Sequence, residues 1–173
     1  MAGQLAAPVV LADSSAAQPE RKVKAAFLYK FLGYTEFPAA AFSDAQAPLM
    51  IGVAGSDELA AELVRIVAGR TVQGRAIQVR TVREGEAPGA LHLLFVAGTE
   101  RDRVRNVLRT VQPAPTLLVT EVENGLQYGS MINFKIVDER VRFDVSLEAA
   151  DRHNVKLSSR LLTVANQVHK GAP

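Results

Sequence analysis

Residues 127–162, QYGSMINFKIVDERVRFDVSLEAADRHNVKLSSRLL, decide the fold, because the alternation of apolar and polar side chains in their first half predicts a β-hairpin. With Asp138 and Glu139 as a two-residue turn, Phe134 faces Phe143. A slip of one residue would set each apolar side chain against a polar one, so the pattern specifies its own register. Glu139 stands where such a turn usually has Gly, which leaves a longer turn open as an alternative. The predicted apolar face holds Ile132, Phe134, Ile136, Val141, Phe143 and Val145.

After the hairpin the period of the apolar residues changes, which predicts helices. Leu147 and Ala150 belong to a short helix, and a second helix is predicted to start at Ser158. The apolar stripe expected for this closing helix consists of Leu161, Leu162, Ala165 and Val168.

The chain before the hairpin alternates strands and helices. Continuous apolar runs predict strands that are covered on both faces, and an alternating run predicts a strand nearer an edge. The buried strands are expected at 49–54, 91–97 and 116–120, and the edge-near strand at 75–82. Helices are expected at 21–37, from Ser56 to residue 67, and from Thr99 to residue 111. Ser56 is a good N-cap, and Thr99 with Asp102 is close to a capping box.

This order of elements implies right-handed crossovers and a mainly parallel sheet. The predicted fold class is α/β: a single-domain layered sandwich with helices on both faces of the sheet, a C-terminal antiparallel hairpin and a closing helix. The strand order is not predicted.

The composition argues against several classes of protein. A chain of 173 residues can bury a core without metal or disulfide staples, and it contains no Cys. Its formal net charge of +2 and the absence of long basic runs argue against a nucleic-acid partner. No run approaches the roughly 20 apolar residues of a membrane span, so the chain is not expected to cross a membrane.

Residues 1–20, MAGQLAAPVVLADSSAAQPE, differ from the rest in being small, Ala-rich and almost uncharged. The run Val10-Leu11-Ala12 resembles the end of a secretory signal with a small-residue cleavage site. The segment is therefore predicted to be a signal-peptide remnant, with a disordered tail as the alternative. Residues 21–170 are predicted to form the single globular domain.

No residues form a catalytic or metal-binding constellation. The three histidines, His92, His153 and His169, lack metal-ligand spacing, and His92 is expected to be a hydrogen-bonded core residue. Ser158 and Ser159 have no nucleophile-elbow motif and are explained as helix caps. The sequence thus predicts no catalytic residue, no metal and no cofactor.

Two helix starts, Gly55-Ser56 and Gly98-Thr99, occupy positions where doubly wound folds bind anions. Asp57 and Glu100 follow them and would repel an anion, and neither glycine belongs to a dinucleotide or P-loop motif. Ordinary helix caps are the favoured interpretation.

The polar face of the hairpin is the candidate binding surface. Lys135 faces Arg142, a pair of like charges that is destabilising unless an anion or carboxylate joins them. Asp144, diagonal to Lys135, can supply that carboxylate. One interpretation is a solvated sheet face with a local ion pair. The other is a recognition surface in which Asn133 and Arg142 bind a partner or a small carboxylate.

Two blocks of the sequence resemble the YfiR/HmsC-like family: GSMINFKIVDERVRFDVSLEAADRHNVKLSSRLL at 129–162 and VKAAFLYKFLGYTEFP at 23–38. Together they bracket most of the predicted domain. The residues that coincide with the family pattern are Asn133, Phe134, Arg142, Phe143, Leu157, Ser158 and Ser159. The departures are Phe37 for a usual Trp, Ser130 and Glu139 for Gly, and Asp144 for Glu.

The resemblance implies a non-enzymatic periplasmic regulator. Such a protein would bind and repress the periplasmic sensor domain of a membrane-bound diguanylate cyclase, and so control cyclic di-GMP and biofilm formation. A homodimer is expected by family analogy. The alternative is a periplasmic sensor of a small carboxylate or amino acid that signals to a histidine kinase or cyclase. An enzyme on the α/β sheet is the least favoured function. The residues expected to bind the partner or ligand are Asn133, Lys135, Arg142, Asp144, Ser158 and Ser159.

Overall fold

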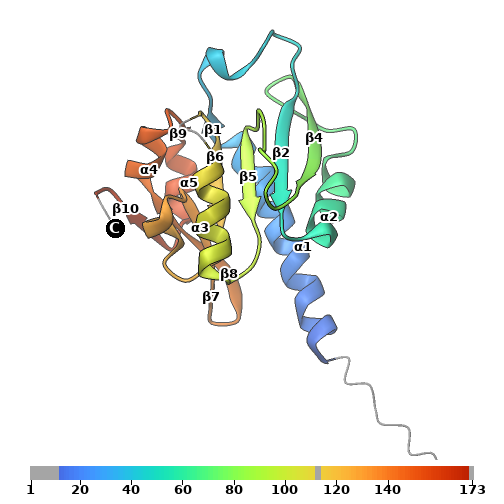
Figure 1. The fold of residues 1–173 in the computed structure, drawn as a ribbon, viewed down its shortest axis with the longest axis vertical. Helices are drawn as coiled ribbons and strands as arrows, with labels where there is room; N and C mark the ends of the chain where they lie inside the picture. The colour runs from blue at the N-terminus through green and yellow to red at the C-terminus, as the bar shows by residue number, and fades with distance from the viewer. Residues whose placement is uncertain (1–11, 112–113, 172–173) are drawn as a thin grey trace, which may run out of the picture.

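A computed structural model describes residues 12–111 and 114–171 (Figure 1). Its centre is an eight-stranded sheet with the strand order β10-β8-β7-β6-β5-β2-β4-β3, and the neighbouring strands from β4 through β2, β5 and β6 to β7 pair in parallel. The predicted fold class is therefore confirmed. The main-sheet strands are β2 (Leu49–Ala54), β3 (Thr71–Val72), β4 (Arg75–Val82), β5 (Leu93–Val96), β6 (Leu117–Thr120), β7 (Ile132–Val137), β8 (Arg140–Ser146) and β10 (Gln167–His169).

Helices cover both faces of the sheet. Phe95 of β5 contacts Phe134 of β7, and Phe134 contacts Phe27 and Phe31 of α1, so these side chains share one face. Helix α2 packs beside α1, whereas α3 lies in front of the strands in Figure 1, with α1 behind them. The helices are α1 (Ala12–Gly33), α2 (Asp57–Val67), α3 (Arg101–Thr110), α4 (Leu147–Arg152) and α5 (Ser159–Val164), with short 3-10 turns η1 (Ala39–Ala41) and η2 (Gly125–Tyr128).

The hairpin has the predicted register throughout, from the Ile132–Val145 pair to the Val137–Arg140 pair. Asp138 and Glu139 form the two-residue turn with φ values of 50° and 63°, the left-handed conformation that a type I′ turn requires. The turn is therefore as short as predicted, although neither residue is Gly. The hairpin extends past the carboxyl end of β6, which pairs with β7 only at Ile132 and Asn133, and its tip projects from the sheet in Figure 1.

The inner part of the hairpin's apolar face completes an aromatic core. Phe143 is 2% exposed, and its ring lies 5.0 Å from that of Phe31 and 5.6 Å from that of Phe27. The outer part of this face keeps the predicted register but is not buried, because Ile136 is 53% exposed. Ile136 lies near the turn, where the hairpin extends past β6.

The first helix begins at Ala12 and ends at Gly33, rather than spanning 21–37. It ends early because the next residues form strand β1 (Thr35–Glu36), which pairs antiparallel with β9 (Lys156–Leu157). Thr35 is buried, and its hydroxyl donates a hydrogen bond to the carbonyl of Phe31 at 2.6 Å. This small second sheet ties the end of α1 to the C-terminal part of the chain. Residues 1–11 of the predicted signal segment lie outside the described residues.

The closing helix is also shorter than predicted, since α5 ends at Val164. Of the expected stripe, Leu161 is buried, whereas Val168 belongs to β10, which pairs parallel with β8. A strand forms here because the outer edge of β8 would otherwise leave its backbone groups unpaired.

The two predicted helix caps have opposite outcomes. The hydroxyl of Ser56 accepts the backbone N–H of Leu59 at 3.1 Å, so Ser56 caps α2 as predicted. The capping box of Thr99 and Asp102 was wrong, because Glu100 is the N-cap residue of α3 and its side chain makes no capping hydrogen bond.

His92 is a core residue, as expected, and it anchors the loop that precedes β2. Its Nδ1 atom accepts the N–H of Met50 at 3.0 Å, so its Nε2–H group donates to the carbonyl of Ala41 at 2.9 Å. The ring of Phe42 stacks on His92 with centroids 4.5 Å apart, and the guanidinium of Arg75 covers the other side of Phe42 at 3.6 Å. The neutral imidazole thus uses both nitrogens to hold this loop.

We expect the free energy of unfolding to decrease as the pH falls through the range just below 6.5. Burial lowers the pKa of His92, the charge of Arg75 lowers it further, and the bond to Ala41 only partly offsets them. The unfolded chain therefore binds a proton in a pH range in which the folded chain does not, and acid favours unfolding. Urea denaturation at several pH values should show this slope. In His92→Asn, whose side chain does not titrate, the slope should be smaller; an unchanged slope would assign it to other groups.

Candidate functional site

A hollow of about 420 Å³ lies beyond the carboxyl end of β6, between the loop that contains η2 and the polar face of the hairpin. Three of the predicted site residues line it: Asn133, Lys135 and Asp144. They meet because β6 and β7 are adjacent and parallel, so β7 continues past the end of β6 and forms a wall of the hollow. The remaining lining residues are Glu121, Val122, Glu123, Asn124, Gly125, Leu126, Gln127, Phe134 and His169.

An ion pair crosses the hairpin wall of the hollow. Lys135 Nζ lies 2.9 Å from Asp144 Oδ2, and Asp144 Oδ1 accepts a hydrogen bond from Asn166 Nδ2 at 2.9 Å. Asp144 is thus the carboxylate that offsets the facing positive charges of Lys135 and Arg142. With Lys135 it forms the local ion pair that the sequence suggested. The hollow therefore presents adjacent positive and negative groups, an arrangement that can bind a polar or zwitterionic group.

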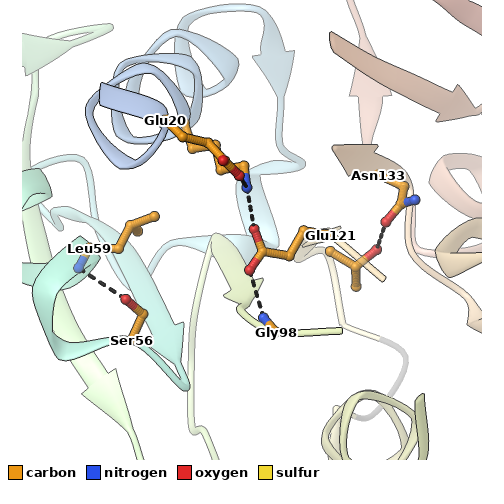
Figure 2. A network of polar contacts seen from close by, with 8 residues as sticks. Glu20, Ser56, Leu59, Gly98, Glu121 and Asn133 are labelled. Carbon is orange, nitrogen blue, oxygen red and sulfur yellow. Dashed lines mark hydrogen bonds and ion pairs between the residues drawn. The ribbon is translucent and has the colours of Figure 1, made fainter. Parts of the chain in front are cut away.

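Asn133 supports the floor of the hollow. Its Oδ1 atom accepts a hydrogen bond from the hydroxyl of Thr120 at 2.6 Å (Figure 2). Its Nδ2 atom donates to the carbonyl of Val122 at 2.9 Å. Gly125 packs directly on this pair, since a Cβ atom there would lie 2.4 Å from both Asn133 Oδ1 and Thr120 Oγ1. Ser130 is buried, with its hydroxyl 2.8 Å from that of Thr120. Asn133 thus makes contacts that position the loop.

The other three predicted residues do not line the hollow. Arg142 is exposed on the outer part of β8. Ser158 accepts the N–H of Arg160 at 3.1 Å and so caps α5, as the sequence indicated. Ser159 is the first residue of α5 and not a cap, contrary to the prediction; it is exposed, and its carbonyl accepts the hydroxyl of Thr163 at 2.9 Å. The predicted surface therefore divides into a hollow and separate exposed positions.

Sequence reasoning missed the loop side of the hollow. Glu123, Asn124 and Gln127 belong to a segment with no strong periodicity, and His169 comes from β10. The one local signal is Asn124-Gly125, a dipeptide typical of turns. Asn124 has a φ of 62°, in the left-handed region that Asn tolerates. Only the strand order, with β6 beside β7, brings this turn opposite the hairpin.

A second, smaller hollow of about 270 Å³ lies at the carboxyl ends of β2 and β5. These strands lead to helices on opposite faces of the sheet, so the chain changes direction here, the position where open α/β sheets bind ligands. Glu121 occupies part of this position. Its Oε1 atom accepts the N–H of Gly98 at 2.7 Å, and its Oε2 atom lies 2.7 Å from Lys24 Nζ (Figure 2).

Lys24 and Glu121 connect α1 to the carboxyl end of β6. Their side chains are only 11% and 18% exposed, and Lys24 also pairs with Glu20. Burial alone would lower the pKa of Lys24, but hydrogen bonds to Glu121 and Glu20 outweigh it and raise the pKa above its usual value. Lys24 is therefore charged at neutral pH. The carboxylate of Glu121 thus binds the backbone N–H group of Gly98.

Two further features of the described residues bear on function. In residues 12–111 and 114–171, no group of three or more His, Cys, Asp or Glu side chains is arranged to hold a metal ion. Across the same ranges, each helix is either too short or too polar to cross a membrane.

Comparison with known proteins gives one family. The profile of the YfiR/HmsC-like family matches residues 21–166, which include α1 from residue 21 onward, the strands from β2 to β8, and α5. A search of curated proteins gives no match. The chain therefore belongs to the YfiR/HmsC-like family, a family of periplasmic regulators of diguanylate cyclase signalling.

Proposed function

We propose that this protein is an exported, non-enzymatic regulator that binds and represses the periplasmic sensor domain of a membrane-bound diguanylate cyclase. Loss of this contact would raise cyclic di-GMP inside the cell and favour biofilm formation. The observation that carries the proposal is the family match over residues 21–166.

The exposed side of the hairpin supplies charged groups for such a contact. Arg142 lies on β8 with its side chain in solvent, and its planar guanidinium suits a carboxylate of a partner. Lys135 and Asp144 lie on the same polar face, and Ser158 and Ser159 lie at the start of α5. We assign these residues to the partner surface, with Asn133 as their support from below.

A second function is favoured by the hollow itself. Its volume of about 420 Å³ falls within the range of small-molecule sites, and the Lys135–Asp144 pair offers both charges to a ligand. In this alternative the protein senses a small carboxylate or amino acid and signals to a kinase or cyclase. A thermal-shift screen of such compounds, repeated with Lys135→Met, tests it: a shift lost in the variant supports a ligand at this site.

The regulator proposal is tested by capture from envelope extracts of the native host, with the full chain as bait. We expect a membrane protein with a diguanylate cyclase domain to be recovered. In Arg142→Ala we expect about tenfold weaker binding, equivalent to about 1.4 kcal/mol, with an unchanged melting temperature because the side chain is exposed. A large fall in melting temperature would show that Arg142 is structural. Recovery of no cyclase or kinase would count against a protein partner.

A further inference from the structure

An apolar groove runs between α1 and the outer end of the hairpin, on the face of the sheet opposite the ion pair. One wall comes from α1 and the other from the hairpin tip, and the open groove between them has a volume of about 500 Å³. The residues that line the groove are Pro19, Glu20, Val23, Phe27, Ile136, Glu139, Arg140 and Val141. We call this surface the α1–hairpin groove.

The groove exposes apolar surface on both of its walls. Val23 is 43% exposed and Ile136 is 53% exposed, and Phe27 and Val141 are partly buried between them and the core. Isolated exposed apolar residues are ordinary, but apolar residues gathered in one concave surface are typical of an interaction site. The core aromatic cluster continues into the groove through Phe27, which contacts Phe143.

The groove favours a helix as its occupant. Its apolar surface consists of side chains of α1 and of one face of the hairpin. The backbone groups of α1 are paired within the helix, and those of the hairpin point along the plane of the sheet rather than into the groove. An occupant must therefore satisfy its own backbone hydrogen bonds, as an α-helix does. A helix with apolar residues at spacings of three and four would place them between Val23 and Ile136.

The charges at the rim restrict the partner further. Glu20 already pairs with Lys24. Glu139 and Arg140 are exposed neighbours at the hairpin tip, and neither forms an ion pair with another side chain of the part of the chain that the structure describes. A complementary helix therefore carries a basic residue opposite Glu139 and an acidic residue opposite Arg140.

From these observations we infer that the α1–hairpin groove binds an amphipathic helix of the regulated membrane protein, with an aliphatic stripe flanked by one basic and one acidic residue. The inference rests on the proposed function and adds a second contact, on the other face of the hairpin, to the partner surface assigned to Arg142 and its neighbours.

The test measures cyclic di-GMP in the native host, with the full chain replaced by single variants. Deleting the gene tests the proposed function, since an unchanged level would refute repression itself. If deletion raises the cyclic di-GMP level, Ile136→Asp and Val23→Asp are each expected to raise it as much as the deletion does, because each places a charge on one wall of the groove. Val64→Asp on α2, a matched control at 52% exposure outside the groove, should leave repression intact. Repression retained in both groove variants would overturn the inference while leaving the proposed function standing.

Two further measurements examine the charges and the identity of the occupant. The double variant Glu139→Arg/Arg140→Glu preserves net charge but reverses its order, so we expect at least a tenfold loss of binding to the captured cyclase's purified periplasmic domain. Normal binding would refute the charge assignment.

A photo-crosslinking residue at position 136 should form a cross-link to a helical segment of that domain. A cross-link to a second copy of the chain, or to residues 1–11 of the same chain, would refute the proposed occupant. Melting temperatures close to that of the wild type would exclude misfolding as the cause.

Discussion

Replacing Phe143 by Ala is expected to lower the free energy of unfolding by about 3–5 kcal/mol, the range found when a buried aromatic residue is truncated. The ring is almost fully buried and contacts Phe27 and Phe31 of α1 edge-on, so its removal leaves a cavity between the helix and the sheet. Urea denaturation followed by circular dichroism measures the effect.

Ile136→Ala is the matched control for this prediction. It truncates an apolar side chain on the same face of the hairpin, but one that is half exposed, so a loss of less than about 1 kcal/mol is expected. The two variants together test the gradient of burial along the hairpin. Equal losses in both would show that the outer end of the hairpin is covered in solution.

Replacing Lys24 by Met is expected to cost about 3 kcal/mol, near the lower end of the range for breaking a buried ion pair. The variant leaves the carboxylate of Glu121 without its positive partner, although the N–H of Gly98 still donates to it. The remaining charge is mostly buried, and this desolvation is the cause of the expected loss.

A double-mutant cycle separates this interaction from other effects of the substitution. In Lys24→Met/Glu121→Gln both charges are absent, and the amide oxygen of Gln can still accept the N–H of Gly98, so part of the lost stability should return. If the double variant were as unstable as the sum of the single variants, Lys24 and Glu121 would not be coupled, and this ion pair would not hold α1 to the end of β6.

The hairpin illustrates how much of this structure could be predicted. Its register follows from side chains that alternate with a period of two, because any other pairing would place apolar residues opposite polar ones. Buried strands such as β2 and β5 were recognisable as continuous apolar runs, and the Ser56 cap followed from the preference of hydroxyl side chains for that position. Each of these features depends on residues close together in the sequence.

The candidate site could be predicted only in part. Lys135 and Asp144 were identified because their diagonal contact lies within one hairpin. The η2 side of the same hollow was not, since its approach to Asn133 depends on the pairing of β6 with β7. The chain that closes the sheet at β10 was mistaken for a helix because the unpaired edge of β8, which makes a strand favourable there, is invisible in the local pattern.

The sequence alone thus determined the α/β class, the hairpin register and the family resemblance, since local periodicity and short motifs encode all three. Only the tertiary structure decided where the sheet places these elements. It brought Glu121 to Lys24 and Gly98, formed the hollow beside Asn133, and left Ile136 exposed opposite Val23. These contacts join segments far apart in the chain. They arise from the strand order and from the length by which the hairpin extends past its neighbours, and neither quantity is encoded in any single stretch of residues.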